Sequence, residues 1–160
     1  MQALDKIDRN IFETEQCIRI GKIRKEFVDF FNTHGLDGKL QYETQILFWK
    51  DRVEHTDAHK DDFSSDAIYR TCFEEIPRII HSPDYISVHP KEKSLSFIRN
   101  YTSNHANVAI RVSVTGGLAY RTMFPLIDAT LTHYIDTKHA WKVVYDENDN
   151  PTIIDKFDAE

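Results

Sequence analysis

The chain has 160 residues, of which 41% are hydrophobic and 29% charged, and its formal net charge is −6 at pH 7. This length suits one domain with a buried core, and no stretch approaches the ~20 apolar residues of a membrane span. We therefore expect a single domain over 1–160 that stays in the cytoplasm, because the N-terminus also lacks the apolar run of a signal peptide. The charge argues against general nucleic-acid binding, and the widely spaced Cys17 and Cys72 predict free thiols rather than a disulfide.

Apolar residues at helical spacing predict helices in the first half of the chain. The expected helices span 3–16, 25–32, 43–59 and 67–81, and short extended segments are expected at 17–23 and 39–42. Pro77 lacks an amide donor, so it should kink or divide the last of these helices. Within 43–59, Trp49 falls on the apolar side, whereas His55 and His59 share one face because they are four residues apart.

From residue 84 onward the apolar residues alternate, which predicts strands. The strands are expected at 85–88, 95–101, 108–114 and 118–124, with a tight hairpin turn at 115–117. A helix from Pro125 to about Asp136 should follow, and 141–145 and 152–155 should form a last hairpin across the turn-rich 146–151. This order predicts an α+β fold in which helices pack on a small antiparallel sheet.

The expected sheet lies in a net-basic part of the chain, since residues 84–123 carry five Lys and Arg and two Asp and Glu. A two-residue turn at Gly116-Gly117 would pair Arg111 with Thr122, so these two would share a face. Arg121 would then lie on the other face or beside a bulge, and a slip of one residue would reverse the assignment. A cationic face fits a phosphate-bearing ligand. The alternative is that the arginines cover the sheet or pair with acidic residues.

The two histidines of the 43–59 segment are the second candidate group. Histidines one turn apart bind zinc in H-E-x-x-H metalloproteases, but Thr56 stands at the glutamate position here and no third ligand follows. Histidine also moves protons near neutral pH, so His55 and His59 are candidate acid–base groups. The alternative is that both are ordinary helix-surface residues. No P-loop, GxGxxG, GxSxG or CxxC pattern is present, which excludes the enzyme classes that depend on them.

Five short patterns between residues 55 and 125 are similar to those of a known group of nucleases. In chain order they read H-x3-H-K-D-D-F, E-x-I-P-R-I-I-x-S-P-D-Y-I, S-x-F-I-R, V-A-I-R-V-S and L-A-Y-R-T-M-F-P. Together they resemble the phage-associated members of the barnase, EndoU, colicin and RelE-like (BECR) nucleases. The resemblance covers about residues 18–136, and it leaves 137–160 as an appended C-terminal hairpin.

This resemblance implies a BECR-like fold and metal-independent RNA cleavage by a toxin-like or phage-carried domain. In such cleavage the ribose 2′-OH attacks the adjacent phosphate, which requires a base, an acid and cations for the charge on the phosphorane. The resemblance implies that His55 or His59 is the acid or base, that Arg111 and Arg121 bind the phosphate, and that Thr122 hydrogen-bonds a phosphate oxygen. The further substrate-binding candidates are Arg99, Tyr101 and Lys91.

The expected partners are RNA, tRNA included, and a cognate inhibitor or immunity protein. No cofactor, metal ion or membrane is expected. Two alternatives stay open from the sequence: a catalytically inactive relative that binds RNA or a protein, and an unrelated acidic adaptor domain.

Overall fold

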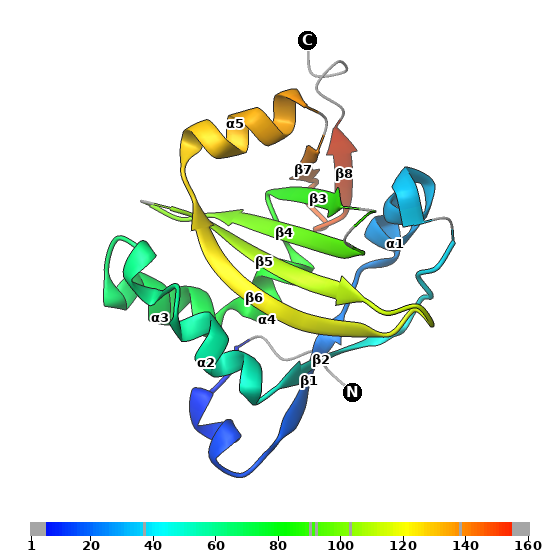
Figure 1. Ribbon diagram of the computed structural model, residues 1–160. Coiled ribbons are helices and arrows are strands. Elements are labelled where there is room, and N and C mark those ends of the chain that lie inside the picture. The colour runs from blue at the N-terminus through cyan, green and yellow to red at the C-terminus, as the bar shows by residue number, and fades with distance from the viewer. Residues whose placement is uncertain are drawn as a thin grey trace.

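The computed structural model describes residues 6–36, 38–89, 91, 93–102, 104–137 and 139–154 (Figure 1). Its helices are η1 (Arg9–Glu13), α1 (Lys25–Phe31), η2 (Asn32–Leu36), α2 (Asp51–Asp57), η3 (Lys60–Asp62), α3 (Asp66–Glu74), α4 (Ile76–His81) and α5 (Asp128–Asp136). Its strands are β1 (Cys17–Lys22), β2 (Gln45–Trp49), β3 (Tyr85–His89), β4 (Ser94–Asn100), β5 (His105–Val112), β6 (Leu118–Leu126), β7 (Ala140–Tyr145) and β8 (Pro151–Ile154). None of these helices is long and apolar enough to cross a membrane.

The strands described form one sheet in the order β1-β2-β6-β5-β4-β3-β7-β8. Each neighbouring pair is antiparallel except β2 and β6, which run parallel. The predicted α+β fold is therefore confirmed, including the β3–β6 meander and the last hairpin. Because β7 pairs with β3, the β7–β8 hairpin continues the main sheet instead of standing apart from it.

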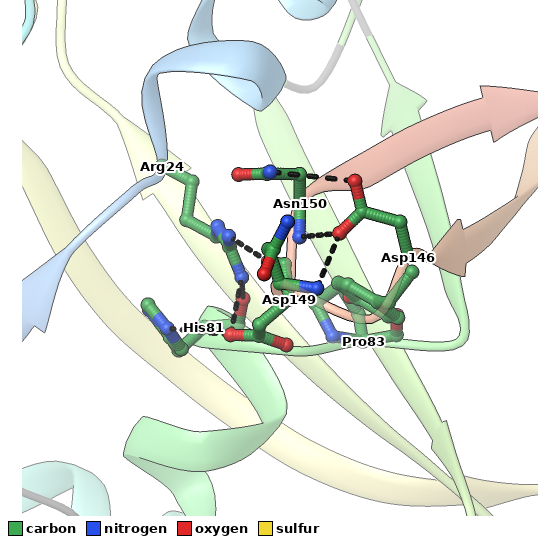
Figure 2. Close-up of polar contacts among 8 residues, drawn as sticks. Arg24, His81, Pro83, Asp146, Asp149 and Asn150 are labelled. Carbon is green, nitrogen blue, oxygen red and sulfur yellow. Dashed lines mark hydrogen bonds and ion pairs between the residues drawn. The ribbon is translucent and has the colours of Figure 1, made fainter.

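The turn of that last hairpin is fastened to the rest of the domain (Figure 2). Within the turn, the Asp146 carboxylate accepts hydrogen bonds from two backbone amides, those of Asn148 and Asn150. Arg24, just before α1, donates one hydrogen bond to the Asp149 main-chain oxygen at 2.5 Å and another to its carboxylate at 3.4 Å. Nε2 of His81, at the end of α4, lies 3.9 Å from the same carboxylate. The hairpin turn thus contacts the residue before α1 and the last residue of α4.

The core lies mainly on one face of the sheet, under α1, α3 and α4. The Phe48 ring stacks on the Tyr120 ring there, with centroids 4.0 Å apart, and lies tilted against the Phe73 ring at 5.9 Å. The opposite face carries a smaller cluster that includes Ile98 and Leu131, through which α5 covers one end of the sheet. Figure 1 shows α5 above the sheet and α3 with α4 below it.

Three element predictions were wrong. The segment 43–59 is not one helix, because Ile46 and Phe48 are buried at alternate positions of β2 and the helix begins only at Asp51. An apolar run of this length fits either period, and pairing with two neighbouring strands decides for the strand. Residues 39–42 form no strand. In 3–16 only η1 is helical, and residues 3–5 lie outside the described residues.

The other elements agree with the sequence to within a few residues. The helix over 67–81 is divided into α3 and α4 at Glu75, immediately before the turn that contains Pro77. Strand β6 continues through Pro125, so α5 begins at Asp128. The predicted strand residue 155 lies outside the described part of the chain. Both cysteines are free thiols as predicted, and burial raises the pKa of Cys72 to about 12.

Candidate active site

A cleft of about 950 Å³ opens where β2 ends and α2 begins, beside β5 and β6. It is lined by Gln16, Trp49, Lys50, Asp51, Arg52, His55, Arg111, Ala119, Tyr120 and Arg121. Four of these side chains are cationic and one is a carboxylate. The cleft is therefore locally positive on a chain whose net charge is −6.

The hairpin turn between β5 and β6 is longer than the predicted two-residue turn. The Ser113 amide donates to the Gly117 oxygen at 2.8 Å, and the Gly116 amide donates to the Ser113 oxygen at 3.0 Å. Gly116 has φ +89°, and a Cβ at this position would lie 2.7 Å from the main-chain oxygen of Lys39. Both the backbone conformation and the close approach therefore require glycine here.

This longer turn changes the pairing of Arg111. Arg111 is opposite Ala119, so the predicted pairing of Arg111 with Thr122 is wrong. Farther along, Ala109 is opposite Thr122, which leaves Arg121 as the extra residue of a β-bulge. Because alternation runs from Ala119 to Arg121, both arginines lie on the same face of the sheet. Both side chains are exposed. The bulge, which was one of the two alternatives predicted for Arg121, directs this side chain into the cleft.

Helix α2 lies beside β6 where β2 stops, because β2 pairs with β6 only as far as Ala119 (Figure 1). Two contacts fix it there. The buried Thr56 hydroxyl lies 2.6 Å from the Tyr120 hydroxyl, and Arg52 Nε donates to the Arg121 main-chain oxygen at 2.7 Å. The contact of Thr56 holds the buried side of α2 against β6, and the hydrogen bond of Arg52 connects α2 to the bulge. His55, next to Thr56 in sequence, is thereby held at the cleft.

The far end of α2 is anchored by Asp57. The Arg9 guanidinium donates to both of its carboxylate oxygens, at 2.8 Å and 2.6 Å, and the Tyr69 hydroxyl donates to one at 2.5 Å. The hydrogen bond from Arg9, followed by that from Tyr69, lowers the pKa of Asp57 against the opposing effect of burial. Asp57 is thus a structural carboxylate, and its bonds keep α2 from rotating away from η1 and α3.

The surroundings of His55 favour the neutral imidazole over its protonated form. Partial desolvation lowers its pKa most, and the positive charges of Arg52, His59 and Arg121 lower it further. A neutral imidazole has one nitrogen free to accept a proton. The cleft therefore combines a proton acceptor with several fixed cations.

His59 lies one turn beyond His55 and next to the cleft, not among the residues that line it. The two imidazole centroids are 6.1 Å apart, and the His59 ring lies 5.9 Å from the Phe124 ring. Its Nδ1 is 3.4 Å from the Asp62 carboxylate, and its side chain is 35% exposed. A ligand in the cleft that extends along β6 would meet it.

Thr122 follows Arg121 but is only 8% exposed and does not line the cleft. Its Oγ1 and the Oδ1 of Asn107, on the adjacent strand, are buried without a hydrogen-bond partner among the described residues. Because Thr122 is opposite Ala109, it lies on the same face of the sheet as Arg111, as predicted, but it is covered and lies farther along the strands than the cleft.

The three further substrate-binding candidates do not reach the cleft. Arg99 lines a separate pocket of about 370 Å³ beside α4, which shares no residue with the cleft. The Tyr101 hydroxyl donates to Glu75 at 2.7 Å, and burial raises its pKa. Lys91 is exposed between β3 and β4. The structure thus brings together His55, Arg111 and Arg121.

Sequence reasoning missed several residues of the cleft, notably Trp49, Lys50, Arg52 and Gln16. The prediction of one long helix had put Trp49 on the apolar side of that helix, whereas its side chain is 48% exposed at the end of β2. One signal could have found the others: an apolar run that ends abruptly in Lys-Asp-Arg is typical of a strand that ends at a polar site. Among the described residues, no group of three or more His, Cys, Asp or Glu could hold a metal ion.

Comparison with known proteins gives one positive result. Residues 30–133 match the family model described as phage-Barnase-EndoU-ColicinE5/D-RelE like nuclease3. Neither a search of curated proteins nor a search of solved structures gives a match. The matched segment covers more than half of the chain and contains both histidines, Arg111 and Arg121. The resemblance seen in the sequence is confirmed, and the chain belongs to this family of phage-associated, BECR-like nucleases.

Proposed function

We propose that the chain is an endoribonuclease that needs no metal ion and cleaves RNA by attack of a ribose 2′-OH on the adjacent phosphate. The observation that carries this proposal is the meeting of His55 with Arg111 and Arg121 in one positive cleft. These side chains come from α2, β5 and β6, which are distant in sequence. Family membership supports nuclease chemistry, and the cleft supports a mechanism built on side chains alone.

His55 acts as the general base. Its pKa is lowered, so at neutral pH the imidazole is ready to take the proton of the 2′-OH. The neighbouring cations that lower its pKa also attract the phosphate, so the base and the phosphate-binding groups work in one place. General-base catalysis of this kind contributes roughly 10²–10⁴-fold to a rate.

Arg111 and Arg121 bind the non-bridging oxygens of the phosphate. A guanidinium presents a planar fork that matches two phosphate oxygens, and its charge stabilises the phosphorane more than the ground state. Arg52 adds a third guanidinium. Its Nε is bonded to the Arg121 main-chain oxygen, and its remaining nitrogens have no hydrogen-bond partner among the described residues. Arg52 therefore supports the bulge and adds positive charge at the same time.

His59 serves as the general acid for the leaving 5′-oxygen. It follows the end of α2, with its ring centroid 6.1 Å from that of His55 and 5.9 Å from that of Phe124 on β6, so a substrate that runs from the cleft along β6 meets the base first and the acid second. Thr122 takes no part in the chemical step, because its side chain is buried and lies outside the cleft lining.

In a cell, such an enzyme acts in the cytoplasm on RNA, tRNA included, as a toxin or as part of a phage or mobile element. An uncontrolled endoribonuclease would damage the cell that makes it, so a cognate inhibitor is part of the proposal. A positive cleft favours an inhibitor with an acidic surface.

The test is digestion of tRNA and other structured RNAs by the purified protein in EDTA. We expect internal cleavage that leaves 2′,3′-cyclic phosphate ends. His55→Ala, Arg111→Ala and Arg121→Ala should each lose at least tenfold in rate. Arg99→Ala is the matched control, because it removes an arginine of the same sheet that lies outside the cleft. A folded protein that binds RNA but cleaves none of a broad panel would favour the inactive relative instead.

A further inference from the structure

Trp49 is a large apolar side chain that the fold leaves half in water. Its side chain is 48% exposed, and Tyr42 is the other large aromatic residue that is similarly exposed among the described residues. Tyr42 has protein partners, since its hydroxyl bonds to Asp29 and the Lys25 ammonium lies 5.5 Å from its ring centroid. Trp49 makes no ring or cation–π contact within the described part of the chain. A single exposed apolar side chain is ordinary on a protein surface, so the position of Trp49 in the cleft, and not its exposure alone, is what points to a ligand.

The strand register aims this indole into the cleft. Leu47 of β2 is opposite Ala119 of β6, and Trp49 lies two residues farther along β2, so its side chain points to the same face as Ala119. Arg111 pairs with Ala119 from the other side. Trp49 therefore lies diagonally across from the small Ala119, on the same face as Arg111, and all three line the cleft.

The neighbours of Trp49 suit a nucleotide. The cations that line the cleft bind its phosphate, whereas an indole face binds the π-face of a base. Gln16 lies beside Trp49, because β1 and β2 pair at Cys17 and Trp49 and the Lys50 amide donates to the Gln16 main-chain oxygen at 2.8 Å. Its side-chain amide both donates and accepts, which is what the edge of a base requires.

We propose that Trp49 is the stacking platform for one unpaired nucleobase next to the cleaved phosphate. The substrate class is accordingly single-stranded RNA, or a loop nucleotide whose base is free to leave its stack. Bases inside a duplex are already stacked and paired, so their faces are closed to the indole. The inference rests on the proposed function in that both use the same cleft, but it concerns binding, not chemistry.

The experiment uses Trp141→Phe, which leaves Trp49 as the sole tryptophan. Trp141 packs edge-on against Phe30 at 5.0 Å, a contact that phenylalanine retains in part. The probe is a single-stranded 2′-O-methyl oligoribonucleotide, which has no 2′-OH nucleophile and so binds without being cleaved. We expect saturable quenching of Trp49 fluorescence. A duplex of the same sequence should quench weakly, and an oligonucleotide without bases should bind through its phosphates without quenching.

Substitutions give the second readout. Trp49→Ala should weaken binding of the single strand by roughly 5- to 150-fold, the range for loss of one base–aromatic stack, and Trp49→Phe should recover most of it. Tyr42→Ala is the matched control, because it removes an exposed aromatic outside the cleft and should leave affinity unchanged. Thermal melts check that each variant folds. If Trp49→Ala fails to fold, the quenching experiment still tests the stacking role, because it uses Trp141→Phe.

The outcomes separate this inference from the proposed function. Binding without quenching, or equal affinity for Trp49→Ala and the parent, overturns the stacking role while RNA cleavage by the parent would leave the nuclease proposal intact. Quenching by the modified strand without cleavage of the unmodified RNA supports the stacking role and contradicts the proposed chemistry. A single strand that fails to bind at all overturns both.

Discussion

The buried contact between Thr56 and Tyr120 offers a quantitative test of how α2 is held on β6. Thr56 has one hydroxyl proton, which it gives to the Arg52 main-chain oxygen at 2.7 Å. The Tyr120 hydroxyl, 2.6 Å away, must therefore donate to Thr56. Thr56→Val keeps the shape of the side chain but removes the acceptor. It leaves the phenol donor without a partner in a residue that is 1% exposed.

The two single substitutions should differ in size. An unpaired buried donor costs about 1–3 kcal/mol, and Thr56→Val also loses a hydrogen bond worth about 1 kcal/mol, so we expect it to destabilise the protein by about 2–3 kcal/mol. Tyr120→Phe removes the donor itself and leaves the bond from Thr56 to Arg52 in place, which should cost about 1 kcal/mol. In the double variant no donor is stranded, so its cost should fall about 1 kcal/mol below the sum of the two.

Urea unfolding of the four proteins, followed by circular dichroism, measures these free energies of unfolding. The prediction is a coupling of about 1 kcal/mol between the two sites, with Thr56→Val the more damaging single change. Additivity within about 0.5 kcal/mol, or a larger cost for Tyr120→Phe, would refute the assigned direction of the hydrogen bond.

Three further predictions follow from the same geometry. Because the pKa of His55 is lowered from 6.5, the acidic limb of kcat/KM for RNA, where the base becomes protonated, should lie below that pH; Arg121→Gln should raise the His55 midpoint in an NMR titration, and an unmoved midpoint would contradict the coupling. Gly116→Ala should lose about 1–3 kcal/mol in a thermal melt, because its φ is +89° and the new Cβ meets a main-chain oxygen; an unchanged Tm would show that the turn adapts. Asp57→Asn should cost about 1 kcal/mol at pH 7 through its partly exposed contact with Arg9. Since the folded pKa of Asp57 is depressed below 3.8, this difference in urea stability should shrink as pH falls through that lower pKa, and a difference that is the same at pH 7 and at the lowest pH where both proteins fold would be inconsistent.

The meander was predictable because its apolar residues alternate over long enough stretches. Ile110 and Val112 both proved buried on one face, as the alternation required. The segment 43–59 was not predictable, because Ile46 and Phe48 are compatible with either a strand or a helix face. Only the neighbours of β2, which are distant in sequence, settle the choice, and local periodicity carries no information about them.

The candidate site was predictable only in part, because some of its residues are brought together by contacts between distant segments. Histidine chemistry, the basic segment and the family patterns pointed to His55, Arg111 and Arg121. The face of Arg121, however, depends on a turn longer than the Gly116-Gly117 pair suggests and on a bulge, neither of which strand parity can reveal. Trp49 enters the cleft through the parallel pairing of β2 with β6, which joins residues about 70 positions apart.

That parallel pairing also sets when the cleft can exist during synthesis. One wall comes from residues 16–55 and the other from residues 111–121, and β2 finds its place in the sheet only beside β6. A chain that has been translated only through α3 and β4 therefore has His55 but lacks Arg111 and Arg121. The cleft can therefore form only after residue 121 has left the ribosome. A break anywhere between α2 and β5 would leave His55 on one fragment and Arg111 and Arg121 on the other.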